Sequence, residues 1–120
     1  MNLTEINELA DQQRAARAAA RALAGWLHAE FGDRVEWIRL FGSLARGDWM
    51  GPDESDVDVA VVLRGKSGAD VDRVITLASE GLRQTGFVLA PRIFSTDEFV
   101  RLQQRELRLA RDILEEGQVL

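Results

Sequence analysis

Two aspartates, Asp56 and Asp58, stand one residue apart inside the apolar run DVDVAVVL. In a strand, side chains at positions i and i+2 point to the same face of the sheet. Adjacent carboxylates repel one another, and burying them is costly unless a cation lies beside them. Mg²⁺ suits such a pair, because it commonly binds one or two carboxylates together with phosphate oxygens and water. In isolation, the favoured interpretation is two solvated acids at a strand end, because D-x-D is a common string.

A second group of candidate residues lies upstream of this pair. Gly42 permits close approach of the backbone to a phosphate. Ser43, with the N–H groups that follow it, could hold phosphate oxygens at a short helix start, and Arg46 could add a charge-assisted contact. A turn-rich segment, residues 44–55, connects the two groups, and we expect a hairpin-like return to bring them together. Phosphate donors beside a carboxylate metal site would suit phosphoryl chemistry on a nucleotide.

Hydrophobic periodicity predicts the elements that carry these residues. Helices are predicted over residues 3–31 and 69–84, and a last helix opens at the Ser95–Glu98 capping box. Strands are predicted over residues 34–41, 56–63 and 87–94, where Pro91 indicates an edge position, a bulge or a strand end. This order predicts an α/β (α+β) fold, with a small β-sheet flanked by helices.

The predicted helices also indicate which residues form the core. In helix 3–31 the buried face holds Ala16, Ala20, Leu23, Leu27 and Phe31. In helix 69–84 it holds Val71, Ile75, Ala78 and Leu82. In the last helix, the expected buried positions are Phe99, Leu102, Leu109 and Ile113.

Length and composition exclude several classes of protein. With 120 residues and no cysteine, we expect one domain over residues 1–120 without disulfides or thiolate metal sites. No signal peptide and no apolar run long enough to span a membrane is recognisable, so we expect a cytoplasmic protein without membrane contact. The net charge of −5 argues against stable direct nucleic-acid binding. Two arginine stripes are interpreted as solvated helix faces; they comprise Arg14, Arg17 and Arg21, and Arg101, Arg105 and Arg108.

The stretch GSLARGDWMGPDESDVDVAVV resembles the signature of the minimal nucleotidyltransferases, a group of the polymerase-β-like superfamily. Their pattern is G-S-x-A-R-G, a short variable segment, and then S-D-x-D before an apolar strand. The matching residues are Gly42, Ser43, Ala45, Arg46, Gly47, Ser55, Asp56 and Asp58. The resemblance implies the polymerase-β-like nucleotidyltransferase fold, with a small mixed β-sheet flanked by helices. It also implies Mg²⁺-dependent transfer of a nucleoside monophosphate from ATP or another NTP to a hydroxyl. It implies a nucleotide-binding role for Gly42, Ser43 and Arg46, and a catalytic and metal-binding role for Asp56 and Asp58.

One departure from the family pattern lies in the third predicted strand. Active members usually supply a third carboxylate there, whereas residues 87–94, FVLAPRIF, contain no acid. Ala90 shares a strand face with Val88 and Arg92, and is the place where an acid could be restored. The missing acid leaves two hypotheses open, namely a transferase and a catalytically weak or inactive binding module.

The resemblance also suggests a partner. Minimal nucleotidyltransferases are often paired with a small helical HEPN ribonuclease toxin, so this chain resembles the antitoxin member of such a pair. It would adenylylate the toxin or mask it by contact. Whether the chain also forms a homo-oligomer is left undecided by the sequence. A small-molecule transferase is less favoured, because the chain is too short for a second, acceptor-binding domain. Trp49, beside the candidate site, could stack on a base or pack against the core.

Overall fold

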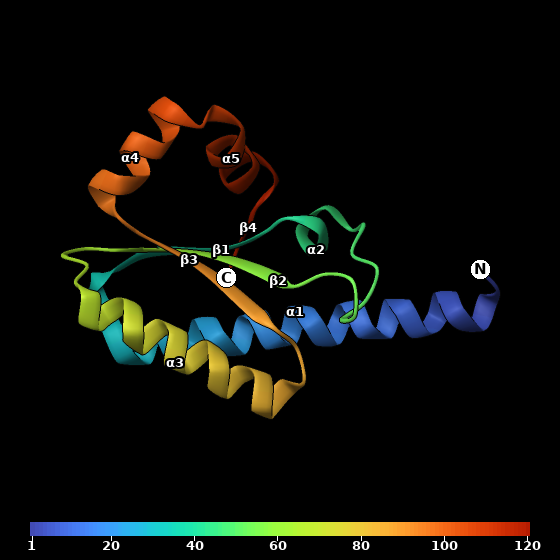
Figure 1. Cartoon of the computed structure of the whole chain (residues 1–120). Helices are drawn as coiled ribbons and strands as arrows, with labels where there is room; N and C mark the ends of the chain where they lie inside the picture. The colour runs from blue at the N-terminus through green and yellow to red at the C-terminus, as the bar shows by residue number, and fades with distance from the viewer.

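The computed structural model describes residues 1–120 as a four-stranded sheet with helices on both faces (Figure 1). In chain order the helices are α1 (Leu3–Phe31), the 3₁₀ turn η1 (Gly32–Arg34), α2 (Ser43–Arg46), α3 (Gly68–Thr85), α4 (Thr96–Arg105), α5 (Leu107–Arg111) and the π-helical turn η2 (Asp112–Glu116). The strands are β1 (Val35–Phe41), β2 (Val57–Leu63), β3 (Leu89–Ser95) and β4 (Gln118–Val119). The predicted mixed α+β architecture is confirmed.

The sheet has the strand order β3-β2-β1-β4. The β1 strand is antiparallel to both β2 and β4, whereas β2 and β3 are parallel and are joined through α3. The three predicted strands are therefore adjacent, with β2 in the centre. The short β4 strand was not predicted, because two residues are too few to show a period.

Pro91 lies in β3, which is an edge strand of the sheet. Proline has no N–H to donate to a neighbouring strand, so an edge is where the sheet tolerates it. Of the three positions predicted for Pro91, the structure shows the edge.

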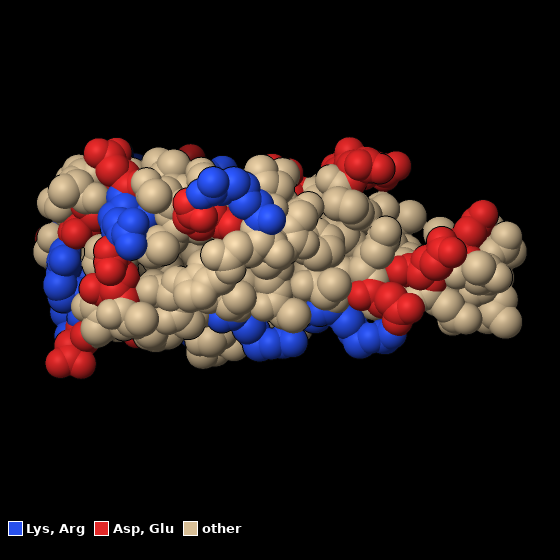
Figure 2. Space-filling view, turned by 90° about the horizontal axis from the view of Figure 1, so that it is seen from below, with Lys and Arg blue, Asp and Glu red and all other residues tan.

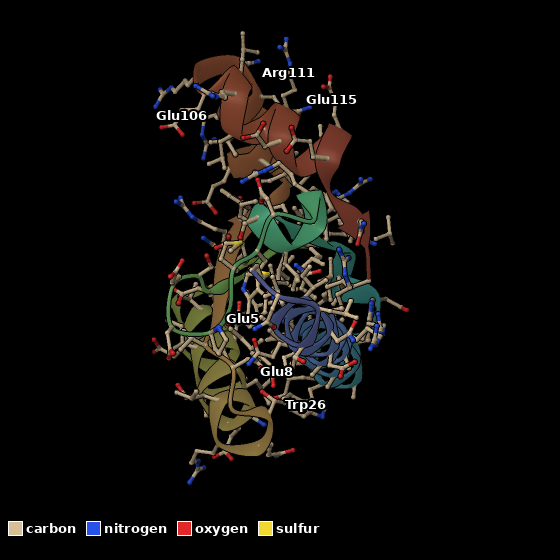
Figure 3. All side chains as sticks on the ribbon, turned by 90° about the vertical axis from the view of Figure 1, so that its right-hand side faces the viewer. Glu5, Glu8, Trp26, Glu106, Arg111 and Glu115 are labelled. Carbon is tan, nitrogen blue, oxygen red and sulfur yellow. The ribbon has the colours of Figure 1, made fainter.

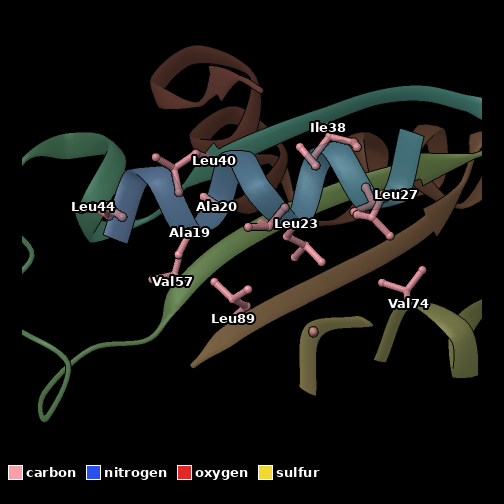
Figure 4. Packing of buried hydrophobic residues seen from close by; sticks show 14 of the residues in the cluster. Ala19, Ala20, Leu23, Leu27, Ile38, Leu40, Leu44, Val57, Val74 and Leu89 are labelled. Carbon is pink, nitrogen blue, oxygen red and sulfur yellow. The ribbon is translucent and has the colours of Figure 1, made fainter. Parts of the chain in front are cut away.

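The larger core lies between the sheet and the layer formed by α1 and α3 (Figures 1 and 4). All five residues predicted for the buried face of α1 are buried. Leu23 and Leu27 of α1 belong to this core cluster together with Ile38 of β1, and Figure 4 labels all three. A smaller core lies on the other face of the sheet, where Phe99 of α4 and Ile113 of η2 pack with Val62 of β2.

The buried face of α3 differs from the predicted one. Val74, Ala78 and Gly81 are buried, whereas Ile75 and Leu82 are exposed. A Cβ at Gly81 would overlap Leu89 and lie 3.3 Å from Trp26. Glycine at this position lets α3 lie close to β3 and α1, and this contact fixes a helix rotation that hydrophobic periodicity alone did not indicate.

The C-terminal region is also less regular than predicted. The single closing helix is interrupted at Glu106, whose backbone is not helical (φ −123°, ψ 70°). The chain continues through α5 and η2 and then turns back to the sheet as β4. Phe99 and Ile113 are buried as predicted, and Leu102 and Leu109 pack partly buried against the same core. Ala110, which was not predicted, is buried as well.

Acidic and basic side chains are interspersed on the face seen in Figure 2. Several pair with each other, as Arg73 does with Glu30 and Arg83 with Glu80. None of the helices is long and apolar enough to cross a membrane.

The first prediction concerns the α1 core contact. Leu23 is completely buried, whereas Leu3 of the same helix is 72% exposed. Leu23→Ala should lower the free energy of unfolding by about 2–5 kcal/mol, because it removes buried methyl groups and leaves a cavity. The matched control Leu3→Ala should change it by no more than about 0.5 kcal/mol. Urea unfolding measures both, and equal losses would contradict the packing described here.

Candidate active site

Asp58 is the only residue of β2 that is not fully buried. It is aligned with Phe41 of β1 on one side and with Ala90 of β3 on the other. Residues aligned on neighbouring strands share a face of the sheet. The carboxylate therefore stands in a central strand between two apolar neighbours, and Asp56, two residues earlier, is exposed just before the strand begins.

Gly42, which lies between β1 and α2, brings the backbone directly against Asp58. It follows β1 and adopts φ 75° and ψ −156°, a conformation that glycine alone adopts readily. A Cβ at this position would overlap the Oδ2 atom of Asp58 and lie 3.2 Å from its Cγ. The two groups of candidate residues thus meet, as the sequence predicted, and only glycine fits at their contact.

Beyond Gly42, the chain forms the single helical turn α2, which starts with the half-buried Ser43 and ends with Arg46. The Arg46 guanidinium lies between two acids: Nε is 3.4 Å from Oδ2 of Asp48, and Nη1 is 3.6 Å from Oε2 of Glu116. Arg46 is also close enough to Asp58 to favour its charged form. The residues predicted to bind nucleotide therefore border the aspartate pair on the α2 side.

The electrostatics of Asp58 follow from its position. Burial raises the pKa of the Asp58 carboxyl above its ordinary value, and the charge of Asp56 raises it further. Arg92 and Arg46 act in the opposite direction but do not cancel the effect. A carboxylate in this situation is stabilised by an added cation, because the cation removes the repulsion and the desolvation penalty together.

The β3 side of the site carries no acid. Ala90 is aligned with Asp58, and Arg92 follows on the same face. Arg92 is exposed and takes part in none of the chain's ion pairs. No group of three or more histidine, cysteine or acidic side chains is arranged to bind a metal. The carboxylates at this end of β2 are therefore Asp58, within the strand, and Asp56, just before it.

Trp49 is a packing residue in this structure. Its side chain is completely buried, and its ring centroid lies 5.9 Å from that of Phe87. Trp49 Nε1 donates a hydrogen bond to the carbonyl oxygen of Ser55 (3.2 Å), and Gln13 Nε2 donates one to the carbonyl oxygen of Trp49 (2.9 Å). Trp49 thereby fixes the loop that leads into Asp56 and is not available to stack on a base.

Sequence reasoning missed the role of Arg17. It was assigned to a solvated face of α1, and for this residue that interpretation is wrong. Its guanidinium donates a hydrogen bond to the carbonyl oxygen of Leu44 in α2 (2.5 Å) and a second to the side chain of Gln118 in β4. No local signal distinguishes Arg17 from Arg14 or Arg21, because its partners lie far away in the sequence.

Comparison with known proteins shows a family and a related protein. Residues 28–120 match the family described as polymerase beta, nucleotidyltransferase. A protein of Methanocaldococcus jannaschii, provisionally named a protein adenylyltransferase, is 33% identical over 102 residues, which are 85% of this chain and 94% of that protein.

Among solved structures, a provisionally named nucleotidyltransferase from Sulfolobus solfataricus has a TM-score of 0.51 and 19% identity, covering 99% of this chain and 87% of the other. A toxin–antitoxin structure with AMP-PNP has a TM-score of 0.53 and 18% identity, covering 82% and 69%. These two structures share the fold of this chain.

The signature around Gly42 and Asp58, the mixed sheet that joins them and the match over residues 28–120 lead to one conclusion. The chain belongs to the polymerase beta nucleotidyltransferase family.

Proposed function

We propose that this protein transfers AMP from ATP to a hydroxyl group of a partner protein in a Mg²⁺-dependent reaction. The observation that carries the proposal is the contact between the Gly42 backbone and the Asp58 carboxylate. This contact supports a site in which the turn would bind phosphate beside a carboxylate pair that would bind a metal. The M. jannaschii relative, which carries adenylyltransferase in its name, supports ATP as the nucleotide.

The donor set fits Mg²⁺. Asp56 and Asp58 supply two carboxylates, and the raised pKa of Asp58 reflects burial and like-charge repulsion that a cation would relieve. Two carboxylates suffice, because Mg²⁺ at nucleotide sites usually takes its other ligands from phosphate oxygens and water. When bound, the ion would neutralise charge on the phosphates and on the leaving group.

The remaining steps are binding of the triphosphate and transfer of the nucleotide. The Gly42 backbone, Ser43 and Arg46 would bind and orient the triphosphate, with Arg46 exchanging Asp48 or Glu116 for a phosphate. The acceptor oxygen attacks the α-phosphorus, and the bond from that phosphorus to the oxygen bridging the β-phosphorus breaks. Pyrophosphate leaves, and the acceptor's proton passes to solvent, since β3 offers no base.

We further propose that the acceptor is a toxin of the HEPN ribonuclease type and that this chain is its antitoxin. The support is the similarity in fold to a chain of a toxin–antitoxin structure that holds an ATP analogue. In this proposal the adenylylated toxin is inactive.

A second candidate function is neutralisation of the toxin by contact alone. The observation that favours it is the composition of β3, where Ala90 stands beside Asp58 and the next residue on that face is the cation Arg92. A positioned general base typically contributes about 10²–10⁴-fold to a rate. Its absence predicts slow transfer with binding retained.

The second prediction tests the aspartate pair. The double variant Asp56→Asn, Asp58→Asn should bind Mg²⁺-ATP at least about tenfold more weakly than wild type, because even residues that only support metal ligands contribute on that scale. Isothermal titration calorimetry measures the affinity. Equal affinities for wild type and the double variant would contradict the proposed site.

Thermal unfolding serves as the control for this variant. Because the pKa of Asp58 is raised in the folded protein, folding becomes less favourable as pH rises from the ordinary aspartate pKa through the raised one. The double variant, which contains Asp58→Asn, should therefore have a higher Tm than wild type at neutral pH and lose this advantage in acid, below the ordinary pKa. A variant that binds poorly but unfolds at a higher temperature has lost ligands and not its fold.

The third prediction restores the missing acid. Ala90 is aligned with Asp58 on the same face of the sheet, so Ala90→Asp should tighten Mg²⁺ binding and raise transfer of labelled AMP to the partner, by as much as about 10²-fold. Ala90→Asn is the matched uncharged control and should give no gain. If wild type transfers AMP as fast as Ala90→Asp, the argument from the absent acid is wrong.

The fourth prediction concerns the partner. We expect a stable complex with a small helical protein encoded by the neighbouring gene and carrying an R-x-x-x-x-H string. Co-expression followed by size-exclusion chromatography should give one joint peak. Separate elution of the two proteins at micromolar concentration would count against the toxin pairing.

A further inference from the structure

The carbonyl groups of α2 are held by side chains from both ends of the sequence. Arg17 of α1 donates a hydrogen bond to the carbonyl oxygen of Leu44 (2.5 Å), and Gln118 of β4 approaches the carbonyl oxygen of Ala45 with its Nε2 atom (3.5 Å). Arg17 also donates to the side-chain oxygen of Gln118. Figure 3, which looks along α1, shows α2 above this helix and the C-terminal segment passing beside both.

A single turn such as α2 needs this support. Four residues are too few to form a stable helix alone, and the last carbonyls of any helix lack partners within it. A cation near these carbonyls is favourable, because the C-terminal end of a helix carries partial negative charge. Leu44 anchors the turn in the core, while Arg17 and Gln118 restrict its orientation around that anchor.

Two features of the C-terminal segment bring Gln118 close to α2. Gln118 pairs with Leu40, two residues before Gly42, through the short ladder between β1 and β4. A Cβ at Gly117 would overlap the carbonyl oxygen of Ile113 and lie 3.2 Å from that of Leu40. Glycine at position 117 therefore lets the C-terminal segment approach β1 closely enough to reach α2.

We propose that Arg17 and Gln118 are positioning residues for the nucleotide-binding turn. Acting through the carbonyls of α2, they fix the orientation of the turn that carries Ser43 and Arg46, and so set the affinity for the triphosphate. The proposal rests on the proposed function, since it assigns these two residues a part in the same site. Their contribution is to nucleotide binding and not to the bond-breaking step.

Four single variants and one double variant separate this role from general stability. Arg17→Ala removes both hydrogen bonds, and Arg17→Lys keeps the charge but cannot bridge Leu44 and Gln118 with a planar fork. Gln118→Ala removes the other end of the bridge. The matched control is Arg21→Ala, one turn further along α1, because Arg21 is exposed and forms no ion pair.

Two measurements are made on each variant, namely amide hydrogen exchange over residues 42–47 and the affinity for Mg²⁺-ATP. Arg17→Ala should speed exchange in this segment and weaken ATP binding roughly tenfold, the scale of one hydrogen bond to a charged group. Arg17→Lys should recover part of the affinity. The double variant Arg17→Ala, Gln118→Ala should lose less than the sum of the two single losses, because a hydrogen bond joins the two side chains. Where transfer is measurable, KM for ATP should rise while kcat changes little.

The outcomes distinguish this proposal from the proposed function. Unchanged exchange in Arg17→Ala, or a loss of affinity equal to that of Arg21→Ala, would overturn the positioning role while leaving the proposed function standing. If wild type binds no ATP, the proposed function fails and the positioning role for nucleotide fails with it. Exchange data would then still show whether Arg17 orders α2.

Discussion

The contact between the Gly42 backbone and the Asp58 carboxylate is the constraint on which the rest of the site depends. It requires a residue without a side chain at position 42, because a Cβ would overlap the carboxylate. It also requires an acid in the central strand, where burial and Asp56 raise the pKa of Asp58. Such a charge arrangement is unfavourable unless a cation lies beside it, and this is the physical reason for proposing a metal ion at this place.

Strands, a loop and the first helix all help to fix the position of this contact. The β1 and β2 strands place Gly42 and Asp58 side by side through their register. Trp49 holds the connecting loop by its hydrogen bond to Ser55. Arg17 donates a hydrogen bond to α2 from the first helix, so α1 contacts the turn that we propose to bind phosphate (Figures 1 and 3).

Local sequence patterns predicted much of this structure, but they did not predict contacts between segments that are distant in the sequence. The apolar run of β2, the capping box at Ser95 and the meeting of Gly42 with Asp58 are encoded within short stretches, and the structure shows all three. The rotation of α3 depends on how Gly81 meets Leu89 and Trp26. The role of Arg17 depends on a residue 101 positions away, and the β4 strand forms only because β1 is there to pair with it.

A crystal structure with a non-hydrolysable ATP analogue and Mn²⁺, which binds oxygen ligands as Mg²⁺ does, tests the central claim most directly. We predict an anomalous peak for the metal at the carboxylates of Asp56 and Asp58, with the triphosphate lying against Gly42 and Ser43. A nucleotide bound elsewhere, with no metal at the aspartate pair, would contradict the assignment of this place as the active site.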